Sequence, residues 1–399
     1  MADRARQVGD DRTGDLIPPP RARQLVAELL QPGLPIRVPT ETAHGLVLAS
    51  AVHAPIALPR FRNAAMDGYA VSLGQVVHES GVAVATAVRP IATGQRLPDE
   101  ADAVVPLERA VEIAPDRIRV LGNIDAGSHV RPAGEELEAG QRALQAGCRL
   151  GPAAMGLLAA LGVADVEVVP APRVGILVTG DELDTAEAAG EATHVTDRIH
   201  DANGPMLRAF VVEAGGHVTA LVHTRDDDRA VRGALARLAR DCDLIFTSGG
   251  ASVGRRDRVA RALETDGQVA LRQLAVRPGR PTCFGFVSGT PVVVLPGNPL
   301  ALLVGAEIIG RPALRRLGGH RRLVRPTVPA RLDARVEVRL DRWEAVPVLL
   351  RQQPDGLVAV PTAKRRSGML TGAASADGLA LLEPGTATPV RVNVELWSR

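Results

Sequence analysis

The chain has 399 residues, of which 46% are hydrophobic and 23% are charged, and its formal net charge at pH 7 is +2. This length predicts about two to four domains, because one hydrophobic core rarely serves so long a chain. The small net charge and the aromatic content of 2% argue against a partner nucleic acid. Three isolated cysteines predict neither a disulfide framework nor a structural zinc site. Residues 1–15 are charged and predict a disordered tail, not a signal peptide, and no apolar run is long enough to span a membrane, so we expect a cytoplasmic protein.

The first part of the chain predicts a small helical unit interrupted by a β domain. Residues 16–58 contain one helical pattern at Arg21–Leu30 and a second that begins at Thr40. A further helical pattern lies in residues 135–170, so we expect these two separated segments to form one discontinuous linker domain. Residues 59–134 contain short Val, Ile and Ala segments broken by Gly and Pro, which predict an inserted β domain.

The second part of the chain predicts a doubly wound, three-layer α/β domain followed by a β-barrel, so that the fold class is α/β and multidomain. In residues 171–320, apolar strand patterns alternate with helical patterns, as a parallel sheet covered on both faces requires. Ligands of such sheets bind at the carboxyl ends of the strands. Residues 321–399 have no helical period, and their alternating Val and Leu segments predict a small C-terminal β-barrel or sandwich.

Three turns between residues 245 and 300 predict the binding of phosphate or another oxyanion. The run Ser248-Gly249-Gly250-Ala251-Ser252-Val253-Gly254 follows an apolar strand, where several backbone N–H groups can converge on one anion. The run Arg277-Pro278-Gly279-Arg280-Pro281 adds two guanidinium groups. The run Leu295-Pro296-Gly297-Asn298-Pro299 ends another strand. One Gly-Gly turn alone is weak evidence of a ligand, but the three turns together favour a binder of oxyanionic molecules.

Acidic residues follow several of the predicted strands, at Asp181, Glu182, Asp201, Asp226, Asp227 and Asp257. Carboxylates beside a phosphate site are typical ligands of Mg²⁺, which prefers hard oxygen donors and keeps part of its water shell. Capping of a helix N-terminus is the alternative, and it competes strongly for Asp226 and Asp227. Glu182 and Asp257 lie beside glycine turns, not at an evident cap, so they favour a role in catalysis or metal binding.

Further runs complete an ordered series of motifs: Asn63–Ala70 (which contains Met66-Asp67-Gly68-Tyr69), Thr179–Leu183, Asp201–Asn203, Arg225–Asp227, and the three turns described above. On these residues the chain resembles the molybdopterin molybdenumtransferases, the family that includes the gephyrin E domain. The resemblance extends from about Leu16 to the C-terminus in the same order. So many ordered matches make the resemblance far more specific than any one motif.

The resemblance implies an L-shaped subunit of four parts that forms a homodimer. Its active site would lie between the α/β domain of one subunit and the inserted β domain of the other. The implied reaction takes the small-molecule substrates adenylated molybdopterin and molybdate, hydrolyses the adenylate with Mg²⁺ as cofactor, and leaves molybdenum on the dithiolene. The implied protein partners are a molybdopterin adenylyltransferase and apo-molybdoenzymes, with no nucleic acid and no membrane.

The resemblance also implies roles for individual residues. The catalytic residues would be Asp67, Glu182, Asp226 and Asp257. The Mg²⁺ ligands would be Glu182, Asp201 and Asp257. The glycine loop would hold the phosphate of the pterin, and Arg277, Arg280 and Ser367 would receive molybdate. The full set that would contact the substrates is Thr93, Ser248, Gly249, Gly250, Ser252, Gly254, Arg277, Arg280, Pro281, Pro296, Asn298 and Ser367.

Three departures from the family pattern suggest a divergent paralogue with an altered oxyanion preference or reduced activity. The family's Lys-Pro-Gly-Lys-Pro turn has arginine in place of both lysines, at Arg277 and Arg280. The charge is retained, but a planar fork replaces a compact ammonium group. The family's Gly-Glu-Asp run appears as Gly134-Glu135-Glu136, and its Met-Thr-Gly-Ala-Pro run keeps only Thr93 and the glycine that follows.

Three alternatives to this enzyme remain open. A protein that binds or stores the pterin without catalysis would not need carboxylates such as Glu182 and Asp257 beside the anion. A dimeric scaffold would need a partner-binding segment, and none is evident in the sequence. An adenylyltransferase would share the α/β domain but would lack the inserted β domain and the C-terminal barrel.

Overall fold

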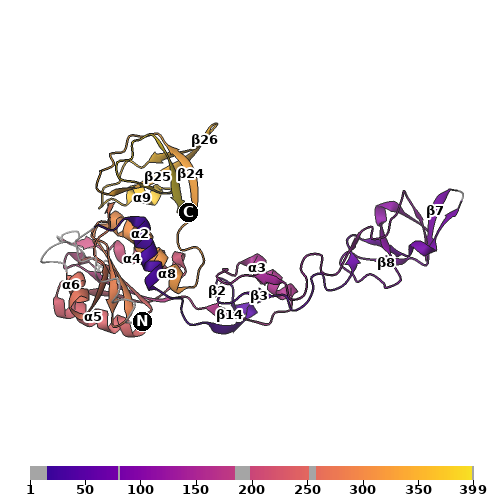
Figure 1. Ribbon diagram of the computed structural model, residues 1–399, viewed down its shortest axis with the longest axis horizontal. Helices are drawn as coiled ribbons and strands as arrows, with labels where there is room; N and C mark the ends of the chain where they lie inside the picture. Colours follow the sequence, from indigo (N-terminus) through magenta and orange to yellow (C-terminus); the bar gives the residue numbers. More distant parts are fainter. Residues whose placement is uncertain (1–15, 80, 185–197, 251–257, 398–399) are drawn as a thin grey trace. The chain divides into compact units, whose positions relative to one another are not determined.

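The structure is a computed structural model that describes residues 16–79, 81–184, 198–250 and 258–397 (Figure 1). The chain divides into two compact units, which are described separately below. The larger unit comprises Met1–Pro35 and Val169–Arg399, and the smaller unit comprises Ile36–Val168. The predicted tail, residues 1–15, lies outside the described residues. Within those ranges, no helix is both long enough and apolar enough to cross a membrane.

A six-stranded sheet forms the centre of the larger unit. Its strand order is β18-β15-β19-β23-β22-β20, and the first four strands are mutually parallel whereas β22 and β20 are antiparallel to their neighbours. The strands span β15 Arg173–Thr179, β18 His217–Thr224, β19 Leu244–Ser248, β20 Gly267–Leu271, β22 Cys283–Val287 and β23 Thr290–Leu295. The central strands β19 and β23 are buried along their whole length. Continuous apolar runs of this kind form strands that are covered on both faces.

Helices cover both faces of this sheet (Figure 1). The helices are α4 Asn203–Ala214, α5 Asp228–Asp241, α6 Arg258–Asp266, α7 Pro299–Gly305 and α8 Arg311–Leu317, with a π-helical segment, η5 Ala306–Gly310, between the last two. One hydrophobic core joins α4, α7, η5 and α8 to the sheet, and a second joins α5 and α6 to its other face. The predicted doubly wound, three-layer domain is therefore confirmed.

The ends of these helices follow the local signals of the sequence. The carboxylate of Asp227 accepts a hydrogen bond from the Ala230 N–H at 2.8 Å and caps α5. Gly215 ends α4 with φ of 95°, in the left-handed region that favours glycine. For Asp227 the sequence suggested helix capping as the alternative to metal binding, and the structure shows this capping contact.

The N-terminal helix α2, Pro19–Leu29, belongs to the larger unit. Its buried side chains Ala22, Leu25 and Val26 enter the same hydrophobic core as α4 and α8. The sequence grouped this helix with residues 135–170 in a linker domain, whereas the structure packs it on the α/β domain. The reason is its single apolar face, which matches the surface of α8 and η5.

The C-terminal strands of the larger unit close into a barrel. Its five strands are β24 Thr327–Leu332, β25 Trp343–Gln353, β26 Gly356–Pro361, β27 Gly378–Leu382 and β28 Val390–Leu396. Their order is β25-β26-β24-β28-β27, and β27 pairs again with β25 to complete the closure. The short strand β21, Val276–Arg277, comes from the α/β domain and pairs in parallel with β25. The barrel prediction is confirmed, and the sandwich alternative is wrong.

The smaller unit begins with a three-stranded sheet, not with a second helix. Strand β1 (Ile36–Pro39) pairs with β14 (Asp165–Val169), which is also the neighbour of β2 (Val47–Leu48). The helix predicted from Thr40 is wrong: the chain makes only one 3₁₀ turn, η1 Thr40–Thr42. The Thr40 hydroxyl donates to the Val163 carbonyl at 2.6 Å, so a contact distant in sequence replaces helical capping. The predicted helix further on is confirmed as α3, Pro152–Ala160.

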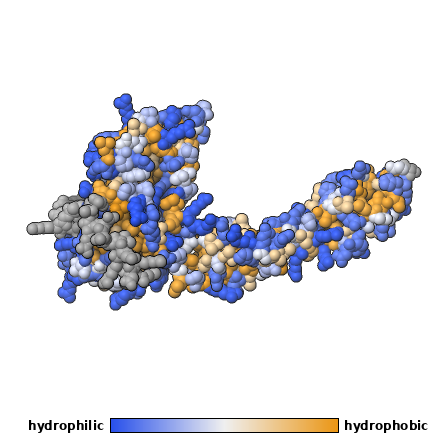
Figure 2. All heavy atoms as spheres, viewed as in Figure 1, coloured by the Kyte–Doolittle hydropathy of each residue, from blue (hydrophilic) through white to orange (hydrophobic). Residues whose placement is uncertain are grey.

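The rest of the smaller unit is a β module formed by residues 59–134. One sheet has the order β10-β11-β7-β6 and another has the order β8-β5-β9. Their strands are β5 Gly68–Val71, β6 Val76–Glu79, β7 Val82–Thr86, β8 Arg89–Ile91, β9 Ala103–Pro106, β10 Ala110–Ala114 and β11 Arg117–Val120. Apolar side chains are visible on the surface of this module in Figure 2, and those exposed include Val77, Val82, Leu107, Val111, Ile113 and Leu121.

Candidate active site

Four parallel strands of the α/β domain end at one edge of the sheet. The strands β15, β19 and β23 are direct neighbours, and β18 lies beside β15. The residues that follow them are Gly180–Glu182 after β15, Arg225–Asp227 after β18, Gly249–Gly250 after β19, and Pro296–Asn298 after β23. The structure therefore brings together four motifs that are widely separated in the sequence, at the edge where ligands of doubly wound sheets bind.

Asn203 connects three of these elements. It begins α4, is 8% exposed, and its side-chain N–H group donates to Ser248 Oγ at 2.8 Å and to the Gly297 carbonyl at 2.7 Å. One amide thus joins the start of α4 to the ends of β19 and β23. Its Oδ1 is buried and has no hydrogen-bond partner among the described residues.

The glycine loop approaches the neighbouring strand closely. Gly249 and Gly250 have φ of 87° and 66°, and the Gly249 N–H donates to the Leu295 carbonyl at 3.2 Å. A Cβ on Gly249 would lie 2.6 Å from the Thr179 carbonyl oxygen. Only glycine satisfies both the left-handed backbone and this close approach. The rest of the predicted loop, including Ser252, Gly254 and the acidic Asp257, lies outside the described residues.

Carboxylates gather beside the loop, after β15 and β18. The Asp226 N–H donates to Asp181 Oδ1 at 3.2 Å. Burial raises the pKa of Asp226, and the negative charges of Asp181 and Glu182 raise it further, whereas Arg258 opposes the shift. Like charges so close together disfavour ionisation until a cation joins them. Three carboxylates therefore lie together after β15 and β18.

Asp201 was predicted as a metal ligand, but both of its oxygens are engaged by the protein. Its Oδ1 accepts from the N–H groups of Asn203 and Gly204, each at 2.9 Å, at the start of α4. Its Oδ2 lies 2.9 Å from His223 Nε2, and the side chain is only 6% exposed. This geometry differs from the predicted role, because a carboxylate held by three donors has little capacity left for a cation. Asp201 instead orients Asn203.

The two arginines of the basic turn are each held by the protein through Nε, and Arg277 also through Nη2. Arg277 Nε donates to Glu344 Oε2 at 2.7 Å, and its Nη2 donates to the Glu337 carbonyl at 3.3 Å. Arg280 Nε donates to Gln273 Oε1 at 3.1 Å. Pro281 follows in the same turn, as the sequence predicts. Both guanidinium groups are therefore oriented by the protein.

Ser367 comes from the barrel but reaches the start of α7. Its carbonyl accepts from the Leu300 N–H at 2.9 Å and from the Ala301 N–H at 3.3 Å. A Cβ on the next residue, Gly368, would lie 3.7 Å from Asn298 Oδ1. Ser367 thus lies beside the turn that contains Pro296 and Asn298, as a shared site requires.

Asp67 and Thr93 belong to the smaller unit, where they contact each other. The Thr93 N–H and hydroxyl both donate to Asp67 Oδ1, at 2.6 and 2.7 Å. These two hydrogen bonds lower the pKa of Asp67, so its carboxylate stays ionised on an exposed surface. The pairing of the two predicted residues supports a shared role for them.

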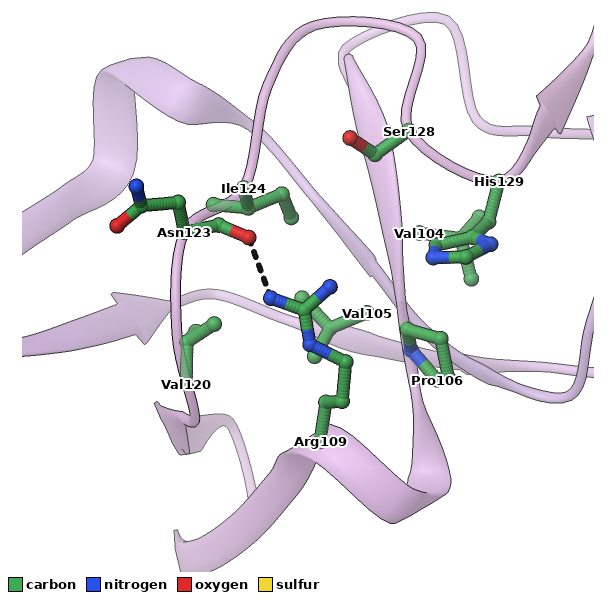
Figure 3. Close-up of a pocket in the computed structure, with 9 residues that line it drawn as sticks. All are labelled: Val104, Val105, Pro106, Arg109, Val120, Asn123, Ile124, Ser128 and His129. Carbon is green, nitrogen blue, oxygen red and sulfur yellow. Dashed lines mark hydrogen bonds between the residues drawn. The ribbon is translucent and has the colours of Figure 1, made fainter.

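A separate small pocket lies in the β module and contains none of the predicted site residues (Figure 3). Arg109 points into it, and its guanidinium donates to the carbonyls of Leu121 at 3.0 Å and Asn123 at 2.5 Å. Because this arginine is already satisfied by carbonyls, the pocket is not assigned as a ligand site. Within the described ranges, no group of three or more His, Cys, Asp or Glu side chains is placed to hold a metal ion.

Sequence reasoning missed three residues that complete this geometry. Asn203 lies inside a motif already singled out, so its position after Asp201 was an available signal. Gln273 and Glu344 belong to no motif, and the sequence gives no sign that they contact the arginine turn. Only the pairing of β21 with β25 brings Glu344 to Arg277.

Comparison with known proteins agrees with this architecture. Three family models match in order: "MoeA N-terminal region (domain I and II)" over residues 17–162, "Probable molybdopterin binding domain" over 175–316, and "MoeA C-terminal region (domain IV)" over 329–394. Molybdopterin molybdenumtransferase 2 of Mycobacterium tuberculosis is 37% identical over 338 residues, which cover 78% of this chain and 82% of the relative. The Haemophilus influenzae molybdopterin molybdenumtransferase is 30% identical over 303 residues, covering 72% and 74% of the two chains.

A solved structure also matches nearly the whole chain. The crystal structure of a molybdopterin biosynthesis MoeA protein from Pyrococcus horikoshii superposes with a TM-score of 0.79 at 28% identity, and it covers 96% of this chain and 100% of its own. Sequence, domain order and fold lead to the same conclusion: this chain belongs to the molybdopterin molybdenumtransferase family.

Proposed function

We propose that this protein transfers molybdenum to molybdopterin during molybdenum cofactor biosynthesis. In the proposed reaction, adenylated molybdopterin and molybdate are the substrates, the adenylate is hydrolysed, and AMP is released. The observation that carries the proposal is the meeting of the glycine loop, the carboxylates and the Pro296–Asn298 turn at the ends of neighbouring parallel strands, with the arginine turn packed against α7, which follows that last turn. Membership of the family supplies the reaction class.

The glycine loop and the turn after β23 form the proposed site for the phosphate groups. Gly249 and Gly250 leave room for an anion to approach the backbone, since neither has a side chain. Asn203 holds the two turns at a fixed separation through Ser248 and the Gly297 carbonyl. An anion placed there would meet a backbone that the protein already holds in place.

Arg277, Arg280 and Ser367 form the proposed site for molybdate. Guanidinium groups give an oxyanion directed hydrogen bonds in addition to positive charge. The carbonyl of Ser367 fixes this residue at the start of α7, next to the turn that contains Asn298, and its hydroxyl would donate to molybdate.

The residues present fit a magnesium ion. Glu182 and Asp257 are the proposed ligands. The support for Glu182 is its place beside Asp181 and Asp226, where burial, and then the charges of the two other carboxylates, raise the pKa of Asp226. Mg²⁺ is commonly bound by one or two carboxylates together with substrate phosphates, so a larger cluster of protein ligands is not required. The ion would neutralise phosphate oxygens and order the attacking water. Asp226 would accept the proton of that water, and Asp201 orients Asn203 through backbone N–H groups.

The proposal includes a homodimer in which Asp67 and Thr93 complete the site of the neighbouring subunit. The apolar side chains exposed on the β module support a protein contact there. Mixed dimers of Asp67→Asn with Glu182→Gln should then recover one intact site, and a fully active monomer would exclude this arrangement. We further propose a cytoplasmic protein that receives its substrate from a molybdopterin adenylyltransferase and delivers its product to apo-molybdoenzymes.

The test is AMP release from adenylated molybdopterin in the presence of molybdate and Mg²⁺. Glu182→Gln and Asp257→Asn should bind the adenylated pterin with nearly unchanged affinity but release AMP far more slowly, because each removes a charge without changing size. Wild-type AMP release by either variant would contradict the role of that residue. A wild-type protein that binds the pterin and releases no AMP would be a storage protein instead.

A further inference from the structure

We propose that Glu344 and Gln273 are positioning residues that hold Arg277 and Arg280 by their Nε atoms and thereby direct the remaining donors, Nη1 of Arg277 and both Nη atoms of Arg280, toward the oxyanion. This inference rests on the proposed function, in which these arginines receive molybdate. It assigns a role in oxyanion recognition to one residue of the barrel and one residue of the α/β domain, neither of which lies in a motif.

The contact of Arg277 with Glu344 is well defined. Glu344 lies on β25 and is 8% exposed, and its Oε2 accepts from Arg277 Nε at 2.7 Å. The Nη2 of Arg277 donates to a backbone carbonyl of the barrel, that of Glu337, at 3.3 Å. Within the described residues, Arg277 Nη1 has no protein acceptor. The arginine side chain is 35% exposed, so part of it is accessible to a ligand.

Arg280 repeats the arrangement with a neutral partner. Its Nε donates to Gln273 Oε1 at 3.1 Å, and in the part of the chain that the structure describes neither of its Nη atoms has a protein acceptor. Both arginines of the turn are therefore held at Nε, and each keeps at least one Nη atom without a protein acceptor among the described residues. Because a guanidinium is planar, a hydrogen bond at Nε also sets the direction of the Nη donors.

Lysine could not use these two anchors in the same way. Its ammonium is a single donor centre at the end of a flexible chain, so a lysine that contacted Glu344 would present the same nitrogen to the carboxylate and to the oxyanion. Arginine can contact its protein anchor with Nε and the oxyanion with an Nη atom. The arginines that replace the family's lysines therefore suit Glu344 and Gln273 as partners. With Glu344 present, we expect arginine at position 277 to bind the oxyanion more tightly than lysine does.

Charge and geometry predict opposite effects when Glu344 is removed. Loss of a carboxylate beside Arg277, and near Arg339 and Arg365, makes the site more positive, so electrostatics alone predicts tighter oxyanion binding. Loss of the anchor leaves the guanidinium free to rotate, so the positioning role predicts weaker binding. The sign of the change therefore separates the two explanations.

The experiment is a double-mutant cycle of Arg277→Lys and Glu344→Ala, read by calorimetric titration with molybdate and with tungstate. In the wild-type background, Glu344→Ala should weaken binding of the oxyanion about ten-fold, which corresponds to ~1.4 kcal/mol. In the Arg277→Lys background, the same substitution should leave binding unchanged or strengthen it, since it frees the ammonium. Glu344→Gln, which keeps an acceptor for Nε, should bind within about two-fold of wild type. Glu344→Leu provides a second variant without an acceptor and with its space filled.

The matched control is Glu395→Gln, which removes another buried carboxylate of the barrel that pairs with Arg23. It should leave oxyanion binding unchanged. Equal effects of Glu344→Ala in both backgrounds, or tighter binding in the wild-type background, would overturn the positioning role. AMP release distinguishes the two proposals: wild type that binds molybdate with the predicted couplings but releases no AMP contradicts the proposed function alone. Wild type that binds neither oxyanion contradicts the positioning role.

Discussion

Arg325 and Glu307 form a buried ion pair between the α/β domain and the barrel. Arg325 Nε lies 3.0 and 3.1 Å from the two oxygens of Glu307, and its Nη2 lies 2.9 Å from Oε1. The Nη1 of Arg325 donates to the Leu396 carbonyl at the end of the last barrel strand, at 3.2 Å. Arg311 contacts the same carboxylate through Nε at 2.6 Å. One carboxylate thus holds two arginines at the domain junction, on the side of the molecule where α2 also pairs with the barrel through Arg23 and Glu395.

We predict that Glu307→Gln lowers the stability of the larger unit by about 3 kcal/mol, because it removes the buried carboxylate that Arg311 and Arg325 share and leaves them only the more exposed Glu213 as a counter-ion. Glu307 is 1% exposed and Arg311 is 3% exposed, so water cannot replace the lost charge. Urea unfolding followed by the fluorescence of Trp343 and Trp397 measures the effect, since both tryptophans lie in this unit. The control is Asp355→Asn, which breaks an exposed pair with Arg331 and should cost less than about 1 kcal/mol. Equal losses in the two variants would contradict the prediction.

Glu307 and Glu344 should affect stability with opposite dependence on pH. Burial favours a raised pKa for Glu307, but hydrogen bonds and charges from Arg311 and Arg325 bring its pKa below the ordinary value of 4.5. Its contribution is therefore present above pH 4.5 and is lost as the pH falls through the lower, folded-state pKa. Burial raises the pKa of Glu344, and Arg277 only partly offsets this, so its contribution is present below pH 4.5 and is lost as the pH rises through the higher, folded-state pKa.

The measurement is urea unfolding of wild type, Glu307→Gln and Glu344→Gln across the range from acid to neutral pH. The advantage of wild type over Glu307→Gln should shrink as the pH falls below about 4.5. The advantage of wild type over Glu344→Gln should shrink as the pH rises above that value. If both stability differences changed with pH in the same direction, the opposite pKa shifts of Glu307 and Glu344 would be contradicted.

Thr93→Val should raise the pKa of Asp67. The backbone N–H of Thr93 is the larger of the two causes that lower this pKa, and the hydroxyl is the second. The valine keeps the N–H and the shape but loses the hydroxyl, so part of the shift should remain. Carboxyl ¹³C titration by NMR measures the change. Thr93→Ser, which retains a hydroxyl donor, should titrate like wild type, and an unchanged pKa in the valine variant would show that the hydroxyl has no effect.

The sequence predicts the strands of the sheet and the turns that follow them well, because both depend on short local patterns of residues. Continuous apolar runs identify β19 and β23, and the glycines after them mark turns. The site is harder to predict where a contact joins distant residues. Glu344 is 67 positions from Arg277, and only the pairing of β21 with β25 brings the two together. The prediction of a helix from Thr40 failed for the same reason, since the Thr40 hydroxyl donates to a carbonyl 123 residues away.

Asn203→Ala should destabilise the protein by about 1–3 kcal/mol and slow AMP release. The substitution leaves Ser248 Oγ and the Gly297 carbonyl without the donor that joins the two turns. Asn203→Asp is the sharper variant, because it keeps the shape but places a carboxylate oxygen opposite the Gly297 carbonyl, which can only accept. Thermal unfolding and AMP release measured together separate lost stability from lost positioning. Turnover unchanged in the aspartate variant would exclude Asn203 from the positioning of the site.

Gly249→Ala should reduce AMP release strongly, because the added methyl group has no space. Its Cβ would lie 2.6 Å from the Thr179 carbonyl oxygen and 2.7 Å from the Thr179 hydroxyl, so β15 and the glycine loop would have to separate. The control is Gly140→Ala. Gly140 has φ of 82°, close to the 87° of Gly249, but no atom lies within 4 Å of its Cβ position. Both variants carry similar backbone strain, of order 1–3 kcal/mol, and only Gly249→Ala adds a steric conflict at the anion site. The difference in activity between the two variants therefore measures the close approach itself, and equal activities would show that the loop tolerates a side chain.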